Sequence, residues 1–418
     1  MSIVNVNLNT YPKKFFNYKG NVYEHFNGYS EENILKTIKL GIYEKVFPVP
    51  HKTIYPVSDV ISHFKSNDKN LFAYHIFVAP GIFTDVLSDT DSFEIPQDVL
   101  DAFHNNKVLI ILDSFIEHTS IKKDSTLHKV LQNTIKKYKL KTENICSVVN
   151  TFNTKSILGI DVITRNIPVA VEPLYETDDI KIQENIKTLM APIQRPYKCM
   201  ALLRKPRRSR CQFAEFIYQN NLLQENIISF NSTKEEVDQY NPNIELKFKH
   251  TLPWQNKVEE FENNKVASVN HLLKLFHNNK LYNKAYCEFI FETELDFPSG
   301  EVIFTEKINK PFKYLYPFIF FGEPNSLEIL HDLGFKTFDK WWDESYDKIK
   351  DSDERIVYIN NLFKDLSGWS HKEWSNTLVE MKDILLHNHN LYFKIHNNHL
   401  CYSELSAYVD QFVAKNDK

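Results

Sequence analysis

The stretch Ala285–Gly322, AYCEFIFETELDFPSGEVIFTEKINKPFKYLYPFIFFG, decides the fold of the second half of the chain. Its first apolar run ends in an acidic residue, and its last apolar run, Tyr316–Phe321, ends at a glycine. Both runs have the length and aromatic content of buried strands. Between them, Thr305-Glu306-Lys307 stands where a helix should begin. This order predicts an open α/β sheet, and such sheets bind ligands beyond the carboxyl ends of their strands.

Glu306 and Lys307 predict a grip on a nucleotide at this place. A lysine at a helix N-terminus supplies charge to phosphate oxygens, and a neighbouring carboxylate accepts hydrogen bonds from ribose hydroxyls. An ordinary charged first turn of a helix contains the same two residues, and the dipeptide alone favours that plainer interpretation. If the pair binds a nucleotide, Glu292 and Thr293 at the end of the preceding strand would face the sugar or the ribose.

The chain has 418 residues, which is more than one hydrophobic core usually holds, so the length predicts two domains. Two prolines within Met190–Pro196 indicate the boundary between them. We therefore predict an α/β fold of two Rossmann-like domains that face each other across a cleft. The ranges are 1–192 for an acceptor domain, 193–345 for a nucleotide-sugar donor domain and 346–418 for a helical segment.

Strand and helix patterns alternate along both predicted domains. The expected strands are 71–78, 107–112, 144–149, 197–203 and 227–230. The expected helices are 96–105, 125–138, 212–220, 267–276, 327–333, 355–363 and 373–386. Ser125 has the residue type of an N-cap, and Gly334 follows a helix where a C-terminal cap is expected. The alternation is typical of parallel sheets covered by helices.

The composition indicates a soluble protein of a reducing compartment. The formal net charge is −4, which argues against a surface coated in positive charge for binding polyanions. The five cysteines form no CxxC pair, and most lie in apolar runs, so we expect buried free thiols. No apolar run reaches membrane-spanning length, and the N-terminal stretch is too polar for a signal peptide. We expect a cytoplasmic location, in the host cytoplasm if the source is a virus.

A basic turn, RKPRRSR at 204–210, follows the strand expected at 197–203. It places five cations in seven positions. Arginine binds phosphate through two parallel hydrogen bonds, so the turn could cradle a diphosphate and stabilise the charge of a leaving group. A local patch that binds nucleic acid and a solvated basic loop are the alternatives. We favour the phosphate cradle because anion sites are common at the carboxyl ends of strands.

A third group, Asp113, Glu117 and His118, follows the buried run KVLIIL. A carboxylate just past a buried strand could deprotonate an acceptor hydroxyl, and burial could raise its pKa into a useful range. A helix N-cap at Asp113 with a surface glutamate is the plainer alternative. Asp113 is the slightly better candidate for the base.

Weaker motifs remain structural in this interpretation. Asp89-Thr90-Asp91 and Asp351-Ser352-Asp353 have the DxD spacing of metal-dependent transferases, but both lie in polar segments that read as solvated turns. His387 and His389 lack further ligands at metal spacing, so no metal site is predicted. The paired tryptophans favour helix packing over a sugar platform. No Walker A, GxGxxG or GxSxG motif supports an ATPase, a dehydrogenase or an esterase.

The segment quoted first resembles the donor-binding half of GT-B glycosyltransferases, particularly the fucosyltransferase-like group. In that group a strand ends in an acidic residue, a TEK motif opens a helix, and a strand of the type xPFIxxG follows. The matching residues here are Glu292, Thr305, Glu306, Lys307, Ile308, Pro317, Phe318, Ile319 and Gly322. The stretches GFKTF at 334–338 and DESYD at 343–347 resemble uncharacterised glycosyltransferase-like proteins of phages and aquatic microbes, and the resemblance covers about the last half of the chain.

The basic turn resembles the PRxHR turn of the same group, with Arg207 and Arg210 matching and Ser209 in place of the histidine. The resemblance implies a metal-independent, inverting transferase that takes a UDP- or GDP-sugar as co-substrate and needs no other cofactor. Where typical fucosyltransferases have Glu-Asn-Ser, this strand end reads Glu292-Thr293, so fucose and a GDP donor stay open.

The acceptor stays open between two classes. A phage-like source makes a hydroxymethylated DNA base plausible, reached by extrusion of the base from the duplex. Lys122, Lys123, Lys136 and Lys137 could then contact phosphate together with the basic turn. A surface glycan is equally simple, and the net charge of −4 favours it slightly. A non-catalytic nucleotide- or nucleic-acid-binding protein of the same shape, and a glycoside hydrolase, are the rival functions.

Overall fold

The structure is a computed structural model. It describes residues 4–6, 72–77, 88–113 except 94 and 96, 123–164 except 150, 194–230 except 204 and 205, 237–238, 282–292 except 283, 300–397 and 403–416. The chain forms two compact units. Unit 1 comprises Met1–Leu174 and His396–Lys418, and unit 2 comprises Tyr175–Ile395.

The sheet of unit 1 is entirely parallel in its described strands. Its order is β1-β2-β3-β4-β6, so the strands follow one another across the sheet in the order of the chain. The bounds are β1 Val4–Val6, β2 Phe72–Phe77, β3 Val108–Asp113, β4 Ile145–Val149 and β6 Asp161–Thr164, and the short β5, Thr151–Phe152, follows β4. Because crossovers between parallel strands are right-handed, such an order sends successive helices to the same face of the sheet.

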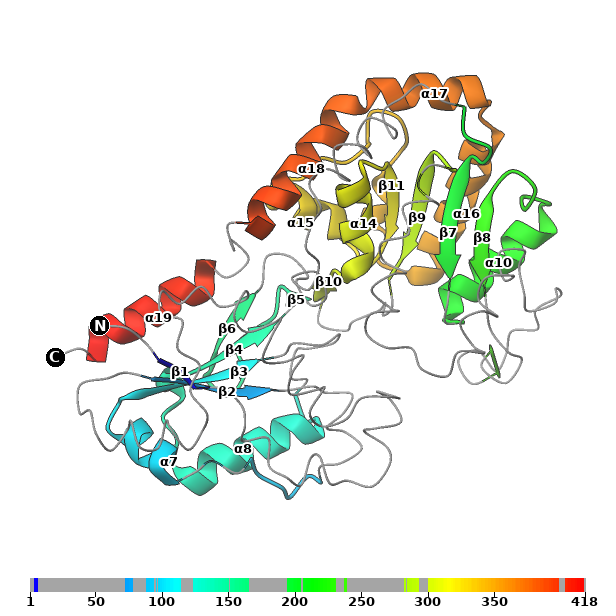
Figure 1. The fold of residues 1–418 in the computed structure, drawn as a ribbon. Helices are drawn as coiled ribbons and strands as arrows, with labels where there is room; N and C mark the ends of the chain where they lie inside the picture. The colour runs from blue at the N-terminus through cyan, green and yellow to red at the C-terminus, as the bar shows by residue number, and fades with distance from the viewer. Residues whose placement is uncertain are drawn as a thin grey trace, which may run out of the picture. The chain divides into compact units, whose positions relative to one another are not determined.

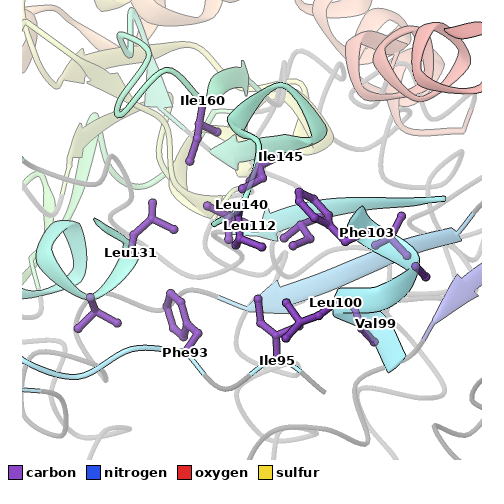
Figure 2. Packing of buried hydrophobic residues seen from close by; sticks show 14 of the residues in the cluster. Phe93, Ile95, Val99, Leu100, Phe103, Leu112, Leu131, Leu140, Ile145 and Ile160 are labelled. Atoms are coloured by element: carbon purple, nitrogen blue, oxygen red, sulfur yellow. The ribbon is translucent and has the colours of Figure 1, made fainter. Parts of the chain in front are cut away.

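The helices α7, Gln97–His104, and α8, Thr126–Tyr138, fit that rule and lie together on one side of the sheet (Figure 1). They enclose an apolar core with the buried faces of β3 and β4, in which Phe103 and Val130 are fully buried (Figure 2). Helix α19, Ser403–Asn416, contacts β6, and the short η2 spans Thr142–Asn144. Unit 1 is therefore held by apolar packing of helices on a parallel sheet.

The sheet of unit 2 is also parallel but has the order β11-β9-β7-β8. Its strands are β7 Cys199–Leu203, β8 Ile227–Phe230, β9 Cys287–Phe291 and β11 Phe318–Phe321, with the short β10 at Val302–Ile303. From β7 the chain goes to β8 on one side, and later to β9 and β11 on the other. The strand order therefore reverses between β7 and β9, a place that we call the switch point.

The reversal distributes the helices of unit 2. Helix α10, Arg208–Gln219, connects β7 to β8, and α14, Glu306–Tyr314, lies between β9 and β11. Right-handed crossovers in opposite directions put these two helices on opposite faces of the sheet. The other elements are α15 Ser326–Asp332, η5 Ser345–Lys348, α16 Ser352–Gly368, α17 His371–Glu380 and α18 Lys382–Asn397. Helix α16 packs on α10 and α14 lies on the opposite face. The sheet is therefore covered on both faces, as in doubly wound folds.

The mixed α/β class and the parallel sheets confirm the coarse prediction. The prediction was wrong at several places. Helix α10 begins at Arg208 rather than at 212, and the helix expected over 373–386 is two helices that meet at the buried Met381. The strands β1, β5, β6 and β10 were not foreseen. The expected boundary at 192 and the helix at 267–276 lie outside the described residues, and the segment expected from 346 onward is divided between the two units.

Several smaller predictions are confirmed. Ser125 caps α8 by accepting the backbone N–H of His128, and Gly334 follows α15 with a φ of +91°. Four cysteines of the described residues are buried and free, namely Cys146, Cys199, Cys211 and Cys287, and Cys401 lies outside this set. Among the helices that the structure describes, none has both the length and the apolar composition needed to cross a bilayer.

Candidate functional site

The switch point of unit 2 is where the two central strands separate. Pairing between β7 and β9 ends at Ala201 opposite Phe289, two residues before each strand ends. The outer pairings continue further, to Leu203 opposite Phe230 and to Phe321 opposite Phe291. Because ligands of doubly wound sheets bind beyond the strand ends at the reversal of strand order, this edge is the candidate site.

The two faces of β9 differ in character. Phe289 and Phe291 pack against Phe213 of α10, and Phe289 also meets Phe363 of α16. Since side chains alternate along a strand, Glu288 and Glu292 point to the opposite face. That is the face of α14, where each glutamate meets partners described below. A strand that looks uniformly apolar in the sequence thus carries two buried carboxylates on one face.

Glu292 joins the end of β9 to the start of α14. Its side chain is fully buried, and Oε1 accepts the backbone N–H of Thr305 at 2.9 Å. The hydroxyl of Thr305 lies 2.8 Å from the other carboxylate oxygen, and the ammonium of Lys307 lies 3.3 Å from that oxygen. Lys307 also donates to Thr305 Oγ1 at 2.7 Å. The carboxylate predicted to face a sugar is therefore directed at the first turn of α14.

Thr305 is the N-cap of α14, as the sequence pattern indicates. Its backbone is extended, and its hydroxyl accepts the N–H of Lys307 at 3.5 Å. A helix N-terminus carries partial positive charge, and the ammonium of Lys307, about one-fifth exposed, adds a full charge there. Glu306 is the first residue of α14, but its side chain is not among those that the structure describes. The element order supports an anion at this place, and the ribose contact of Glu306 stays a prediction.

Arg210, in the first turn of α10, joins that helix to the end of β9. Its guanidinium Nη2 donates to the backbone carbonyls of Phe291 and Glu292 at 2.8 and 2.9 Å, and the residue is only 4% exposed. The guanidinium thus contacts the end of β9, beyond the point where β7 and β9 stop pairing. The sequence analysis placed Arg210 in a basic turn as a phosphate ligand, whereas the fold directs it to the backbone of β9.

The rest of the basic turn has mixed surroundings. Pro206 is followed by Arg207 as the N-cap residue of α10, and Arg207 is half-buried. Arg208 is exposed and forms an ion pair of 2.5 Å with Asp353 of α16. Arg204 and Lys205 lie outside the described residues. Arg207 thus stands at the N-terminus of α10, a position that favours an anion.

The predicted base lies in unit 1, where the structure describes little of it. Asp113 is the last residue of β3, where it is in register with Phe77 and Val148, but its side chain is not described. Glu117, His118 and Thr293 lie wholly outside the described residues. Their roles stay predictions.

Side chains of the stretches 334–338 and 343–347 form hydrogen bonds that stabilise the fold of unit 2. Glu344 accepts the hydroxyl of Thr337 and the backbone N–H of Phe338, and Asp347 accepts the backbone N–H of Leu327 at the start of α15. Tyr346 is buried, and its hydroxyl accepts the N–H of Phe320 on the edge strand β11. These contacts fasten the segment after α15 onto the sheet edge, which leaves its carboxylates no described role at the switch point.

One buried cluster was missed by sequence reasoning. Glu288 accepts the hydroxyl of Tyr282 at 2.9 Å, and burial raises its pKa to about 7, although the nearby Lys310 lowers it. Arg195 is also buried, and its guanidinium lies over the rings of Tyr286 and Tyr316. The signal was present in the sequence, since glutamates at 288 and 292 have the spacing of one strand face and Lys307 and Lys310 that of one helix face.

The weaker motifs have structural partners. Asp89 accepts hydrogen bonds from Thr126 and Lys129, and Asp351 is the N-cap of α16. The ring nitrogens of His387 and His389 contact backbone carbonyls. Within the described residues, no group of three or more His, Cys, Asp or Glu side chains is arranged to hold a metal ion.

Trp374 is fully buried and stacks on Tyr286, which confirms the packing role predicted for this tryptophan.

Comparison of the chain with models of known protein families, with curated proteins and with solved structures gave no match. Any assignment of function therefore depends on the chemistry of the site.

Proposed function

We propose that the protein is a glycosyltransferase whose unit 2 binds a nucleotide-activated sugar at the switch point. The observation that carries the proposal is the separation of β7 and β9 at their carboxyl ends, with the N-termini of α10 and α14 following the two strands. Two helix N-termini and the cations Arg207 and Lys307 favour a ligand with more than one negative charge. A nucleoside diphosphate has that charge and a nucleoside to extend along the strand ends.

Each residue of the predicted site then has a role. Lys307 supplies charge to the diphosphate, and Arg207 at the start of α10 approaches it from the other strand. Glu306 would accept hydrogen bonds from the ribose, and Thr293, which lies outside the described residues, would contact the sugar. Asp113 or Glu117 of unit 1 removes the proton of the acceptor hydroxyl, in an arrangement of the GT-B type. The cations stabilise the leaving diphosphate, so the transfer proceeds without a metal ion. The resemblance to fucosyltransferases adds that the transfer inverts the anomeric carbon.

A thermal-shift titration tests the donor site first. UDP, GDP, dTDP, CDP and CMP are compared, each with and without EDTA. We expect one diphosphate to raise the melting temperature, because a ligand that binds only the folded state stabilises it. The shift should persist in EDTA and should become much smaller in Lys307→Ala. Absence of a shift with every nucleotide would contradict the proposal and leave nucleic-acid binding, tested against salt concentration, as the next candidate.

Turnover separates a transferase from a binding protein that lacks catalysis. The nucleotide that binds is supplied as its sugar conjugate, with short glycans and with DNA that contains hydroxymethylated bases as acceptors. Release of the nucleoside diphosphate only in the presence of one acceptor identifies both the reaction and the acceptor class. Binding of the nucleotide without turnover on either acceptor would favour the non-catalytic alternative.

A further inference from the structure

We propose that Arg210 is a positioning residue of this site rather than a ligand of the diphosphate. It holds the separated end of β9 and, through Glu292, fixes the place of Lys307. This inference rests on the proposed function, because it says which cation of the switch point meets the phosphate and which one acts through the protein.

The first support is the use that the fold makes of the Arg210 guanidinium. Beyond Phe289, β9 is paired with β11 alone, so its other edge has no strand partner among the described residues. Arg210 supplies donors there, to the carbonyls of Phe291 and Glu292. Moving its Nη2 to a phosphate would break both of these hydrogen bonds in a buried place, which costs free energy.

The second support is the connection from β9 to Lys307. The residue whose carbonyl Arg210 holds, Glu292, carries the carboxylate that receives Thr305 and Lys307. Hydrogen bonds therefore connect Arg210 of α10 to Glu292, and Glu292 to Thr305 and Lys307 at the N-terminus of α14. If the end of β9 shifts, the N-cap of α14 and the ammonium shift with it. Lys307 is also the more accessible cation, with a side chain 20% exposed, whereas Arg210 is 4% exposed.

A double-mutant cycle distinguishes positioning from direct contact. Arg210→Lys keeps the charge but has a shorter side chain and no guanidinium, so the two hydrogen bonds that Nη2 donates are lost. The affinity for UDP and for GDP is measured by calorimetry in the parent protein, in Arg210→Lys, in Lys307→Ala and in the double variant. We expect Arg210→Lys to weaken binding about tenfold when Lys307 is present and less than about twofold when it is absent. An equal loss in both backgrounds would show that Arg210 contacts the phosphate itself.

A measurement without ligand keeps the test independent of the proposed function. Hydrogen exchange at the amides of Lys307 and Ile308 reports the order of the first turn of α14, and we expect it to increase in Arg210→Lys. Arg355→Lys is the matched control, since Arg355 is also a buried arginine of unit 2 that donates to a backbone carbonyl, that of Ile349. It should lower the melting temperature without changing exchange at Lys307.

The two failures are distinguishable. If the parent protein binds neither UDP nor GDP, the proposed donor site fails, and the exchange measurement alone decides whether Arg210 positions α14. Unchanged exchange in Arg210→Lys would overturn the positioning role, whatever the affinity for nucleotides.

Discussion

The sheets of the two units are both parallel, yet among the described strands only that of unit 2 reverses its order. In unit 1 the strands β1, β2, β3, β4 and β6 follow chain order, and β3 pairs with both neighbours through its last residue, Asp113. In unit 2 the central strands β7 and β9 stop pairing before either strand ends. In unit 1, β3 therefore stays paired to its carboxyl end. In unit 2 the two central strands separate at their carboxyl ends, because a reversal of strand order sends neighbouring strand ends into different connections.

The difference extends to the side chains beneath each sheet. Among the described residues of unit 1, the buried side chains include no carboxylate. Beneath β9 of unit 2, the buried side chains include Glu288 and Glu292, and the opposing helix α14 carries Lys307 and Lys310. Buried charges cost free energy unless they are paired, so the buried carboxylate of Glu292 at the switch point is a candidate for a role besides stability.

The largest expected effect divides the chemistry between the units. Asp113→Asn or Glu117→Gln, whichever removes the base, should lower turnover about 10²–10⁴-fold and leave the thermal shift by the nucleotide unchanged, since the nucleotide contacts unit 2. Turnover and thermal shift are measured on the same preparations. Asp101→Asn, on the exposed side of α7, is the matched control and should change neither. Loss of the nucleotide shift in Asp113→Asn would break the comparison, because the donor site would then include unit 1.

The next effect is on the stability of unit 2. Glu292→Ala removes the partner of Thr305 and leaves the ammonium of Lys307 beside an uncharged, buried place, so we expect a loss of about 3–5 kcal/mol. All five tryptophans belong to unit 2, so tryptophan fluorescence during urea unfolding reports that unit alone. Glu354→Ala on the exposed side of α16 is the control. A loss below about 1 kcal/mol would mean that Glu292 is not the link between β9 and α14.

The sequence predicted most elements of the fold, because strand and helix periodicities are local. The strand over 227–230 was located residue for residue, and the TEK motif opens a helix as expected. The start of α10 was missed for a reason outside the local sequence. Arg208 and Arg210 look like loop residues, but Asp353 and the carbonyls of β9 provide partners that lie 81 to 145 residues away.

The same distinction applies to the candidate site. Residue types and their order predicted that Glu292 follows a strand and that Lys307 lies in the first turn of a helix, and the structure has both. The direction of each side chain was not predictable, because it depends on strand separation, which no local pattern encodes. The guanidinium of Arg210 donates to the backbone carbonyl of Glu292, and the carboxylate of Glu292 accepts the hydroxyl of Thr305. Glu288 was overlooked because a single acidic residue in an apolar run was not read as one member of a face with period two.

A smaller effect should follow pH. Burial raises the pKa of Glu288 from its ordinary 4.5 to about 7, so the fold favours the protonated carboxyl. Its contribution to stability is therefore full below about pH 4.5 and is lost as the pH rises through 7. Glu288→Gln removes this loss, so it should stabilise unit 2 at pH 8, by on the order of 3 kcal/mol at most, and change little at pH 4.5. Urea unfolding at both pH values checks this, with Glu354→Gln as control; equal effects at both pH values would refute the ionisation account.

The smallest expected effect is at the surface of the same unit. Arg208 and Asp353 form a short ion pair, but their side chains are 66% and 47% exposed, so solvent and salt screen the attraction. Asp353→Asn should cost at most about 1 kcal/mol, less in high salt, and should leave nucleotide binding unchanged. Urea unfolding at low and high salt measures the first effect, and the thermal shift the second. Loss of nucleotide binding would place the outward-facing arginine of α10 in the site, and the inward-facing Arg210 would no longer be what distinguishes this edge from that of unit 1.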